Sequence, residues 1–563
     1  MYPSISLLLV AATTATAQFV KPPTDLITTK GHLDIPVRYK EVPTGVCELD
    51  PNVRSYSGYV DIGQDEHIFW WFFEARNGNA SEAPLTAWIN GGPGSSAMHG
   101  LFQENGPCGI DADGNPVNNP YSWSAVSNML YIDQPGQVGF SYSIPVHGYI
   151  DSSAGLAVSL PDATCPDYAQ DCGTYNNGNL SLTVNSTLDG APKFWRTLQG
   201  FMGAFPQYSQ NAFNFATESY GGRFGPIYSE YIQSQTAKNI PGAAQISVNS
   251  LLIGNGWFDA LVQYQAYYNF TVSPGNTYDY SPFTASQEAQ LYNNVYGAGN
   301  CVDKIEYCVA SGINSVCEAA DNFCGALVEA TYGRYSGRDE YDIRYLTPDP
   351  FPYNYYEEYL NTPKVRAAIG AYKNFSSSSR IVYNAFSNTG DDARELGTIA
   401  AMKSLLDQGV YVNMWYGDAD YNVNWIGGEV ISNMIDAPGF STAGYANITT
   451  SDSIVHGQVK QSGHFSFSRI YECGHLIPFY QPLAALEIFE RVIGRKDIQT
   501  GTIDIDKNKT YVTVGTEKST YREGNGTVQF EVVPAGATYN TTLNAPNPVS
   551  GNGAKELKKA RSW

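Results

Sequence analysis

The chain has 563 residues, of which 43% are hydrophobic and 13% aromatic, so it is long and apolar enough to bury a large core. Its formal net charge is -21 and its isoelectric point is near 4.7, which argues against nucleic-acid binding and suits solubility in acidic surroundings. Because no repeat or heptad pattern is present, we expect one large folded unit rather than a solenoid or a coiled coil.

The first 17 residues are interpreted as a secretory signal peptide, although they lack a basic n-region. Residues 5–12 form a short apolar h-region, and Ala15-Thr16-Ala17 is a small-residue cleavage site. No later run reaches the roughly 20 apolar residues of a membrane span. The C-terminus, AKELKKARSW, lacks the hydrophobic tail of a lipid-anchor signal. We therefore expect a secreted protein, with retention in a vacuole as the alternative, and no membrane segment.

Glycosylation signals and cysteines agree with a secreted protein. Sequons for N-glycosylation occur at Asn79, Asn179, Asn185, Asn269, Asn374, Asn447, Asn508, Asn525 and Asn540. The nine cysteines suit an oxidising compartment, and Cys165 can close a local loop with Cys172. Four further cysteines between residues 301 and 324 could form a zinc site, but they lack a closely spaced C-x-x-C pair.

The first catalytic candidate along the chain is a glycine-rich run, GGPGSS (residues 91–96). It could be read as a phosphate loop, but the lysine of that motif is missing, so the nucleotide-binding interpretation is weak.

Further along, the segment near 145–190 is rich in Cys, Asn and Ser and is interpreted as an insertion. The stretch LDGAPKFWRTLQGFMGAFP (residues 188–206) has helical apolar spacing, which predicts that Phe194, Trp195, Leu198, Phe201 and Met202 are core residues.

The string FNFATESYGG (residues 213–222) is the most informative one in the chain. An apolar strand runs into Ser219, two glycines follow, and residues 223–236 have a helix-like pattern. This is the layout of a nucleophile elbow, in which a strained strand-to-helix turn exposes a serine hydroxyl. Thr217 stands where the usual G-x-S-x-G motif has its first glycine, so the match is weak when taken alone.

Between this serine and the next candidate residues, the segment near 260–355 is interpreted as a larger insertion that forms a cap over the cleft. It contains the four cysteines between residues 301 and 324. Domains built around a nucleophile elbow grow by insertion between strands, so the length of the chain does not require several separate domains.

An acidic loop follows the elbow in the order Ser, Asp, His that α/β-hydrolases show. The run YVNMWYGDADYNVNWIG (residues 411–427) is rich in β-formers and ends in a loop where Asp418 and Asp420 compete as the catalytic acid. A carboxylate in this position would fix the tautomer of a catalytic imidazole and stabilise the imidazolium that forms.

Three histidines follow the serine and are candidates for the general base. His475 stands at the far end of the strand in FSFSRIYECGHLIPFYQP (residues 465–482). His464 stands at the head of that strand, and His456 lies in a polar stretch. A neutral imidazole at the end of a strand can take the serine proton, so we favour His475.

The last part of the chain is predicted to close the domain and then extend it. PLAALEIFERVIG (residues 482–494) has the pattern of an amphipathic helix, and the strings TYVTV and TVQFEVV suggest a β-rich extension whose tail is mobile from Ala545. The boundaries expected from the sequence are residues 1–17, 18–498 and 499–563, with insertions near 145–190 and 260–355.

Eight motifs together resemble one family. They are WINGGPGSSAMHGLFQENGPC (88–108), NPYSW (119–123), DQPGQVGFSYS (133–143), TESYGGRFGP, LLIGNGWFD, YLNTPKVRAAIGA, GDADYNVNWIG and GHLIPFYQP. In this order they resemble the serine carboxypeptidases, and the secreted filamentous-fungal branch most of all, from about residue 30 to 495. The resemblance implies an α/β-hydrolase fold, with a central, mostly parallel sheet flanked by helices, and no metal or organic cofactor.

The resemblance also assigns roles to individual residues. It implies a triad of Ser219, Asp420 and His475. The backbone N–H groups of Gly92 and Tyr220 would then form the oxyanion hole, which stabilises the negative oxygen of the tetrahedral intermediate.

Three polar side chains, Asn90, Glu104 and Glu218, are implied to bind the C-terminal carboxylate of the substrate. A carboxylic acid can donate a hydrogen bond to that carboxylate only while it is protonated, and two acids in one enclosed site raise each other's apparent pKa. The alternative is structural: Glu104 would cap the local turn and Glu218 would form an ion pair.

The resemblance implies a nested pair of disulfides, Cys301–Cys324 around Cys308–Cys317. The local pair Cys165–Cys172 and, by elimination, Cys47–Cys108 complete the expected set, which leaves Cys473 unpaired. The chain also departs from the family pattern: Ser95 replaces a disulfide cysteine, Leu476 replaces a frequent methionine, and Val423 stands where some relatives have a free cysteine. These departures leave every catalytic atom in place.

The function expected from the sequence is a secreted serine carboxypeptidase with an acidic pH preference. It would release C-terminal amino acids from peptides with a free C-terminus through an acyl-enzyme, and it would carry N-glycans. An esterase or acyltransferase is the alternative, because the same acyl-enzyme serves either outcome. A catalytically silent binding protein is a third class, but such a chain need not retain the whole set of site residues.

Overall fold

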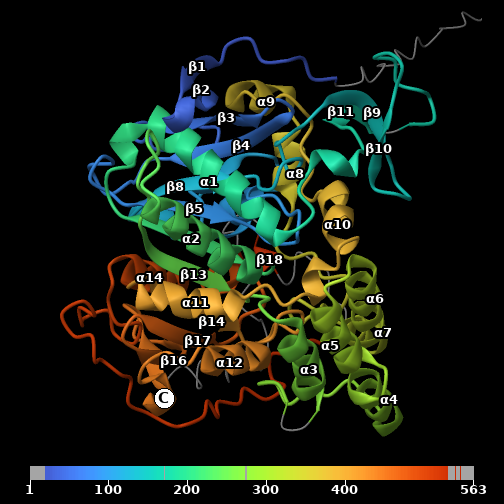
Figure 1. The fold of residues 1–563 in the computed structure, drawn as a ribbon, viewed down its shortest axis with the longest axis vertical. Helices are drawn as coiled ribbons and strands as arrows, with labels where there is room; N and C mark the ends of the chain where they lie inside the picture. The colour runs from blue at the N-terminus through green and yellow to red at the C-terminus, as the bar shows by residue number, and fades with distance from the viewer. Residues whose placement is uncertain (1–18, 170, 273–274, 531–538, 541–544, 547–563) are drawn as a thin grey trace, which may run out of the picture.

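The computed structural model describes residues 19–169, 171–272 and 275–530, together with two short strands, β18 (Tyr539–Asn540) and β19 (Ala545–Pro546) (Figure 1). The expected signal peptide and almost all of the expected mobile tail lie outside the described residues. Within the described part of the chain, no helix combines the length and the apolar character that a membrane crossing requires.

A twelve-stranded mixed sheet forms the centre of the molecule, in the order β1-β2-β3-β4-β8-β5-β12-β13-β14-β17-β16-β15. The central strands are parallel: β8 (Asn128–Ile132), β5 (Leu85–Ile89), β12 (Phe213–Glu218), β13 (Val248–Gly254), β14 (Tyr411–Gly417) and β17 (Phe465–Ile470). The outer strands pair antiparallel: β1 (Ile27–Lys30), β2 (Pro36–Glu41), β3 (Ser55–Gly63), β4 (Glu66–Phe73), β15 (Ala446–Thr449) and β16 (Val455–Ser462). The prediction of a central, mostly parallel sheet is confirmed.

Both faces of this sheet are covered. Along β13, Leu251 and Ile253 pack into one apolar core and Leu252 into the other, as expected where side chains alternate between faces. The helices α1 (Thr187–Ala204), α2 (Gly221–Ala237) and α11 (Thr398–Asp407) cover the first face, and α14 (Pro482–Ile493) covers the second (Figure 1). The predicted core residues of α1 are all buried.

The first insertion forms a small sheet of its own. Its strands are β9 (Pro145–Asp151), β10 (Leu156–Ser159) and β11 (Cys172–Asn176), with β9 in the middle. A disulfide between Cys165 and Cys172 closes the loop between β10 and β11. Figure 1 shows this sheet projecting beside α10 (Arg380–Ser387).

The second insertion is helical. It contains α3 (Ala260–Thr271), α4 (Ala285–Tyr296), α5 (Cys301–Ser311), α6 (Asn314–Cys324), a π-helical turn (Gly325–Glu329) and α7 (Thr331–Ser336). Disulfides Cys301–Cys324 and Cys308–Cys317 tie α5 to α6 in the nested arrangement that the sequence analysis expects. These helices lie together at one side of the sheet (Figure 1) and form what we call the cap.

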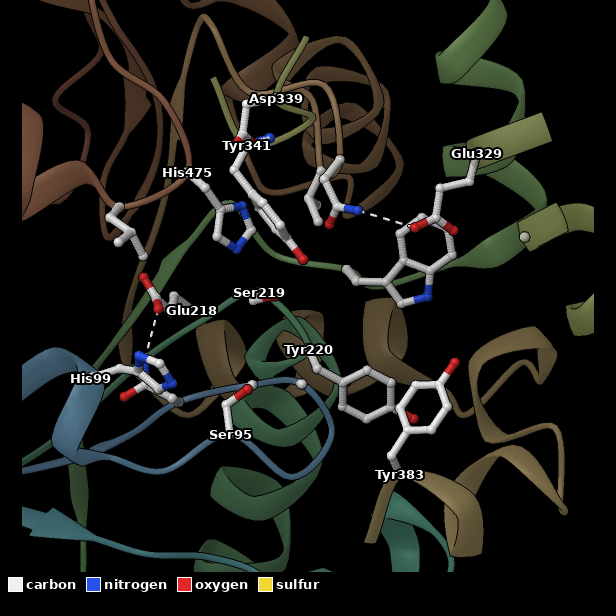
Figure 2. A pocket seen from close by; sticks show the side chains of 18 of the residues that line it. Ser95, His99, Glu218, Ser219, Tyr220, Glu329, Asp339, Tyr341, Tyr383 and His475 are labelled. Atoms are coloured by element: carbon white, nitrogen blue, oxygen red, sulfur yellow. Dashed lines mark hydrogen bonds between the residues drawn. The ribbon is translucent and has the colours of Figure 1, made fainter. Parts of the chain in front are cut away.

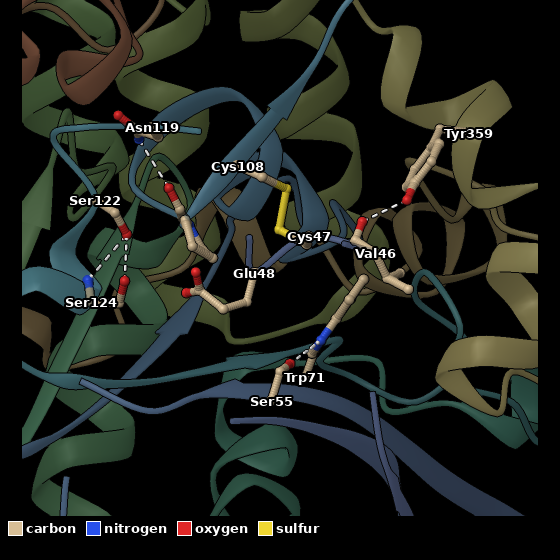
Figure 3. The surroundings of a disulfide bond; sticks show 12 residues. Val46, Cys47, Glu48, Ser55, Trp71, Cys108, Asn119, Ser122, Ser124 and Tyr359 are labelled. Atoms are coloured by element: carbon tan, nitrogen blue, oxygen red, sulfur yellow. Dashed lines mark hydrogen bonds between the residues drawn. A yellow bond between two sulfur atoms is a disulfide. The ribbon is translucent and has the colours of Figure 1, made fainter. Parts of the chain in front are cut away.

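The fourth disulfide, Cys47–Cys108, supports a turn that carries Glu104 (Figure 3). It ties the loop after β2 to the strand β6 (Cys108–Ile110), which pairs with β7 (Pro116–Asn118). Next to this hairpin, Asn119 Nδ2 donates a hydrogen bond to the Glu104 carbonyl oxygen at 3.2 Å. The asparagine of the NPYSW motif therefore fixes the backbone of that turn.

The remaining α-helices are α8 (Tyr355–Leu360), α9 (Pro363–Ile369), α12 (Trp425–Met434) and α13 (Ile477–Tyr480).

The C-terminal extension is less regular than the β-rich segment that the sequence suggests. Residues 499–530 contain no β-strand and pair with the main domain only through isolated bridges, such as Tyr445 with Thr516 and Ser462 with Val512. Its other contacts with β16 are separate hydrogen bonds, such as Thr513 N to the Gln461 carbonyl and Ser519 Oγ to Gln458 Oε1, and they do not form a continuous ladder. Among the described residues of the extension, regular pairing is limited to β18 with β19.

Candidate active site

Ser219 lies in the turn between β12 and α2, as the elbow motif predicts. Its φ angle is +61°, a left-handed conformation that is strained for a residue with a side chain. Two neighbouring segments hold this backbone: Ser219 N donates to the Gly254 carbonyl at 2.9 Å, and Trp257 N donates to the Ser219 carbonyl at 2.9 Å. The strain is thus imposed by hydrogen bonds from the next strand and the loop after it.

Close backbone approach explains why glycines surround this turn. A Cβ atom on Gly91 would lie 2.4 Å from the Tyr220 nitrogen, and a Cβ on Gly221 would lie 2.0 Å from Thr217 Oγ1. No side chain can occupy such a position without moving the elbow. The second distance also shows how the chain accommodates Thr217 in place of the usual glycine, because its side chain occupies the space that Gly221 leaves free.

His475 and Asp420 form a hydrogen-bonded pair at the ends of β17 and β14. His475 Nδ1 lies 2.7 Å from Asp420 Oδ2, and the Asp420 side chain is fully buried. The same carboxylate oxygen accepts hydrogen bonds from Asn255 Nδ2 at 2.7 Å and from the Val423 amide at 3.2 Å. Sequence reasoning did not single out Asn255, although it lies in the quoted motif LLIGNGWFD, and its φ of +40° marks a constrained position.

The competing candidates have other partners. Asp418 accepts a hydrogen bond from Tyr278 OH at 2.7 Å. His456 pairs with Asp452, and His464 pairs with an aspartate of the C-terminal extension. Of these candidates, only Asp420 and His475 are brought together, and His475 also lines the cavity that exposes Ser219.

The electrostatic environment favours the protonated imidazole. Burial lowers the pKa of His475, but the charge of Asp420 and its hydrogen bond raise it, and Glu218 and Glu340 raise it further, so the net shift of the pKa is upward. This is the behaviour required of a general base that must hold a proton in the transition state.

A cavity of about 860 Å³ lies beside this pair (Figure 2). Its lining includes Ser219 and His475, and Figure 2 shows the His475 imidazole lying above Ser219. Gly92 and Tyr220 line the same cavity, as do Val423 and Leu476 at positions where the chain departs from the family pattern. Cys473, the one unpaired cysteine of the described residues, is fully buried.

Asn90, Glu218 and Glu104 form a buried polar cluster next to the serine. Asn90 Nδ2 donates to Glu218 Oε1 at 2.7 Å, and Trp88 Nε1 donates to Asn90 Oδ1 at 2.7 Å, which fixes the orientation of the amide. Burial raises the pKa of Glu104 well above its usual range, and the neighbouring Glu218 charge raises it further. Burial likewise raises the pKa of Glu218. The pair can therefore share protons in acidic solution.

The cavity wall on the cap side is acidic. It carries the carboxyl groups of Asp321, Glu329, Asp339, Asp349 and Asp392, and none of the described residues that line the cavity is a lysine or an arginine. Burial and the neighbouring carboxyl groups raise the pKa of Glu329 to about 8, and the same causes raise the pKa of Asp349 to about 8. At acidic pH these walls lose the negative charge that would repel the carboxylate of a peptide.

Comparisons with known proteins agree with this geometry. The sequence profile of the serine carboxypeptidase family matches residues 45–495. Carboxypeptidase S1 of Penicillium janthinellum is 37% identical over 466 residues, which cover 81% of this chain and 99% of that protein. Carboxypeptidase S1 homolog B of Arthroderma otae is 37% identical over 548 residues, which cover 90% of this chain and 83% of that protein.

A solved structure shows the same fold. The prohormone-processing carboxypeptidase Kex1(delta)p of Saccharomyces cerevisiae superposes with a TM-score of 0.60 at 19% identity, and the alignment covers 81% of this chain and 91% of that one. The α/β-hydrolase architecture predicted from the sequence is confirmed. With the family profile matching most of the chain and the fungal relatives matching across it, the chain belongs to the serine carboxypeptidase family.

Proposed function

We propose that Ser219, His475 and Asp420 carry out the peptidase reaction of this chain through an acyl-enzyme. Ser219 Oγ attacks the last peptide carbonyl carbon while His475 takes its proton, and the same proton then passes to the nitrogen of the leaving amino acid as the C–N bond breaks. Water, deprotonated by His475, then attacks the acyl carbon; the ester bond to Ser219 Oγ breaks, the proton passes from His475 to Ser219 Oγ, and the shortened peptide is released. Asp420 keeps the imidazole in the tautomer with Nε2 free to accept the proton.

The oxyanion of both tetrahedral intermediates is assigned to backbone donors at Gly92 and Tyr220. Both residues line the cavity with Ser219, and the close approach of Gly91 to the Tyr220 nitrogen brings the glycine loop against the elbow. Fixed amide donors in a buried site stabilise developing charge without reorganisation of solvent.

One observation carries the exopeptidase assignment: Asn90 and Glu218, which are hydrogen-bonded to each other, line the cavity that contains Ser219, and the buried Glu104 lies close enough to Glu218 for the charge of Glu218 to raise its pKa. In this proposal Asn90 and protonated Glu218 donate hydrogen bonds to a terminal carboxylate, and Glu104 shares its proton with Glu218. The raised pKa of each acid supports an acidic working range, because the donors are lost when the acids ionise.

Secretion and glycosylation form the second part of the proposal. Asn79, Asn179, Asn185, Asn269, Asn447, Asn508 and Asn525 have exposed side chains in the structure, which suits glycan attachment. We leave Asn374 out of the proposed set because it is 8% exposed, its Oδ1 accepts a hydrogen bond from the Thr174 amide, and its Nδ2 donates to Asn361 Oδ1. Asn540 lies in β18, whose side chains are outside the described residues.

The test compares one peptide with a free C-terminus and the same peptide with a C-terminal amide, followed by mass spectrometry. We expect sequential loss of single residues from the free peptide and little turnover of the amide. Glu218→Ala should remove most of this preference, whereas Glu82→Gln, at an exposed side chain outside the cavity, should preserve it. Equal turnover of the two peptides by the wild type would contradict the role of the terminal carboxylate, whereas turnover of an ester substrate without turnover of either peptide would favour an esterase or acyltransferase.

A further inference from the structure

The segment that leads out of the cap, residues 338–346, braces both catalytic loops through its backbone. The Glu340 carbonyl accepts hydrogen bonds from the amides of Tyr421 and Asn422, each at 2.9 Å, and the Ile343 amide donates to the Ala419 carbonyl at 2.9 Å. These contacts hold the residues on either side of Asp420. We call residues 338–346 the brace.

The brace also holds the loop of the catalytic base. The His475 amide donates to the Tyr341 carbonyl at 2.9 Å, and the two rings contact each other with centroids 5.0 Å apart. Figure 2 shows the Tyr341 side chain lying beside the imidazole. The carboxylate and the imidazole, which come from different strands, are thus fastened to the same short segment.

The brace is held in turn by residues 517–530 of the C-terminal extension, which we call the strap. The Gln529 amide donates to the Arg344 carbonyl at 2.7 Å, and the Leu346 amide donates to Gln529 Oε1 at 3.2 Å. Val528 of the strap is buried, with 7% of its surface exposed. The strap lies beyond residue 495, where the match to the family profile ends.

Arg469, at the end of β17, anchors the other end of the strap. It is 1% exposed, and its guanidinium donates to Ser519 Oγ at 2.9 Å, to the Tyr521 carbonyl at 3.0 Å and to Thr277 Oγ1 at 2.5 Å. The Tyr521 ring stacks on Tyr471 with centroids 3.8 Å apart. One buried arginine therefore joins the sheet, the strap and the first segment of the cap.

The strap contacts the entry to the cap as well as its exit. The Glu523 amide donates to the Thr277 carbonyl at 2.9 Å, and Arg522 forms an ion pair with Asp279. In Figure 1 the orange-red extension follows the edge of the sheet near β16 toward α3. The strap thus spans both connections between the cap and the sheet.

From these contacts we propose that the strap is a positioning element for catalysis, which keeps the brace, and through it Asp420 and His475, in register with Ser219. This inference rests on the roles proposed above for those three residues. Small displacements of aligned catalytic groups are costly, and a shift near 1 Å can lower the rate about 100-fold. A loosened strap would therefore lower turnover while the carboxylate-binding cluster stays intact.

Full-length variants test the proposal. Tyr521→Ala removes the stacking on Tyr471, and Gln529→Ala removes the acceptor of the Leu346 amide, whereas Gln529→Glu retains that acceptor. Tyr511→Ala is the matched control, because Tyr511 is an aromatic residue of the same extension that packs against the core of the sheet and donates to Gln499. Active sites are counted by exhaustive labelling of Ser219 with a fluorophosphonate, so that kcat refers to folded, reactive enzyme.

We expect Tyr521→Ala and Gln529→Ala to lower kcat per labelled site roughly tenfold for peptide and ester alike, with peptide KM nearly unchanged, and Gln529→Glu to recover most of the loss. The titratable groups that face His475 are the carboxyl groups of Asp420, Glu218 and Glu340 and the ring of Tyr341. The carboxylates raise the pKa of the imidazole, and the brace carries one of them, Glu340. Loosening the brace should therefore move the acidic limb of the kcat–pH profile to lower pH.

Two results would overturn the inference. Unchanged kcat and an unchanged acidic limb, with a lower Tm like that of Tyr511→Ala, would mean that the strap only stabilises the fold. A loss of kcat in Gln529→Glu as large as in Gln529→Ala would exclude the Leu346 contact as the link. Failure of the proposed function is recognised separately, because then wild-type Ser219 would resist labelling or its removal would leave turnover intact.

Discussion

The affinity for peptides should depend on pH through the buried acids Glu104 and Glu218. Burial raises the pKa of each, and the charge of Glu218 raises that of Glu104 further. Since a substrate carboxylate needs protonated donors, binding is complete below the raised pKa values and is lost as the pH climbs through them. Each pH unit above the controlling pKa makes the protonated form about tenfold rarer, so peptide KM should rise about tenfold per unit.

The variant Glu218→Gln separates ionisation from shape. The amide keeps an oxygen that can accept the 2.7 Å hydrogen bond from Asn90, and it donates a hydrogen bond at every pH. At acidic pH the variant should bind peptides roughly tenfold more weakly, because the shared proton is gone. Its KM should then rise less steeply toward neutral pH, since the substituted group cannot ionise and repel the substrate.

The assay measures kcat and KM between pH 4 and pH 7.5 for a dipeptide with a blocked N-terminus and for an ester without a free carboxylate. Ester KM should stay flat, while its kcat follows the protonation of His475. A flat peptide KM in the wild type, or equal effects of Glu218→Gln on the peptide and the ester, would refute the carboxylate-binding role of the cluster.

Four further outcomes are expected. Ser219→Ala should lower kcat by several orders of magnitude, measured per folded molecule, and a residual activity above about one tenth would reject this nucleophile. Gly91→Ala should cost roughly 100-fold in kcat with a native circular dichroism spectrum, because its Cβ would collide with the elbow. Tm should be higher at pH 5 than at pH 8: the pKa values of Glu329 and Asp349 rise to about 8 on folding, so the folded state binds protons more tightly and stability declines as pH rises through this range. Glycopeptide mapping should find Asn374 unmodified, and a glycan there would contradict the buried position found for it.

Local patterns in the sequence were sufficient to predict the centre of the fold. The elbow around Ser219 is encoded in residues 213–236 by an apolar strand, two glycines and a helix pattern, and β12 and α2 form at the predicted place. The choice between Asp418 and Asp420 could not be made from their own segment, because both follow the same strand. Partners distant in the sequence distinguish them: Tyr278 contacts Asp418, and His475 contacts Asp420.

The parts that sequence reasoning missed depend on contacts between distant segments. The extension has strand-like composition in TYVTV, but Val512 and the nearby Thr516 form only isolated bridges, with Ser462 and Tyr445, so composition predicted more regular structure than forms. Neither the brace nor Asn255 has a local signature, since their importance comes from the carbonyl groups and carboxylate that the fold places beside them.

These contacts bear on how a parallel sheet can support a triad. The sheet fixes the positions at which β12, β14 and β17 end. Asp420 and His475 lie beyond β14 and β17, in loops that the sheet alone does not hold. The 2.7 Å contact between the two side chains is therefore maintained by backbone hydrogen bonds from the brace, which is itself the exit of the cap. Under the roles proposed above, a cap that lines the cavity and also positions Asp420 and His475 would couple substrate enclosure to catalysis, because a movement of the cap exit would disturb both at once.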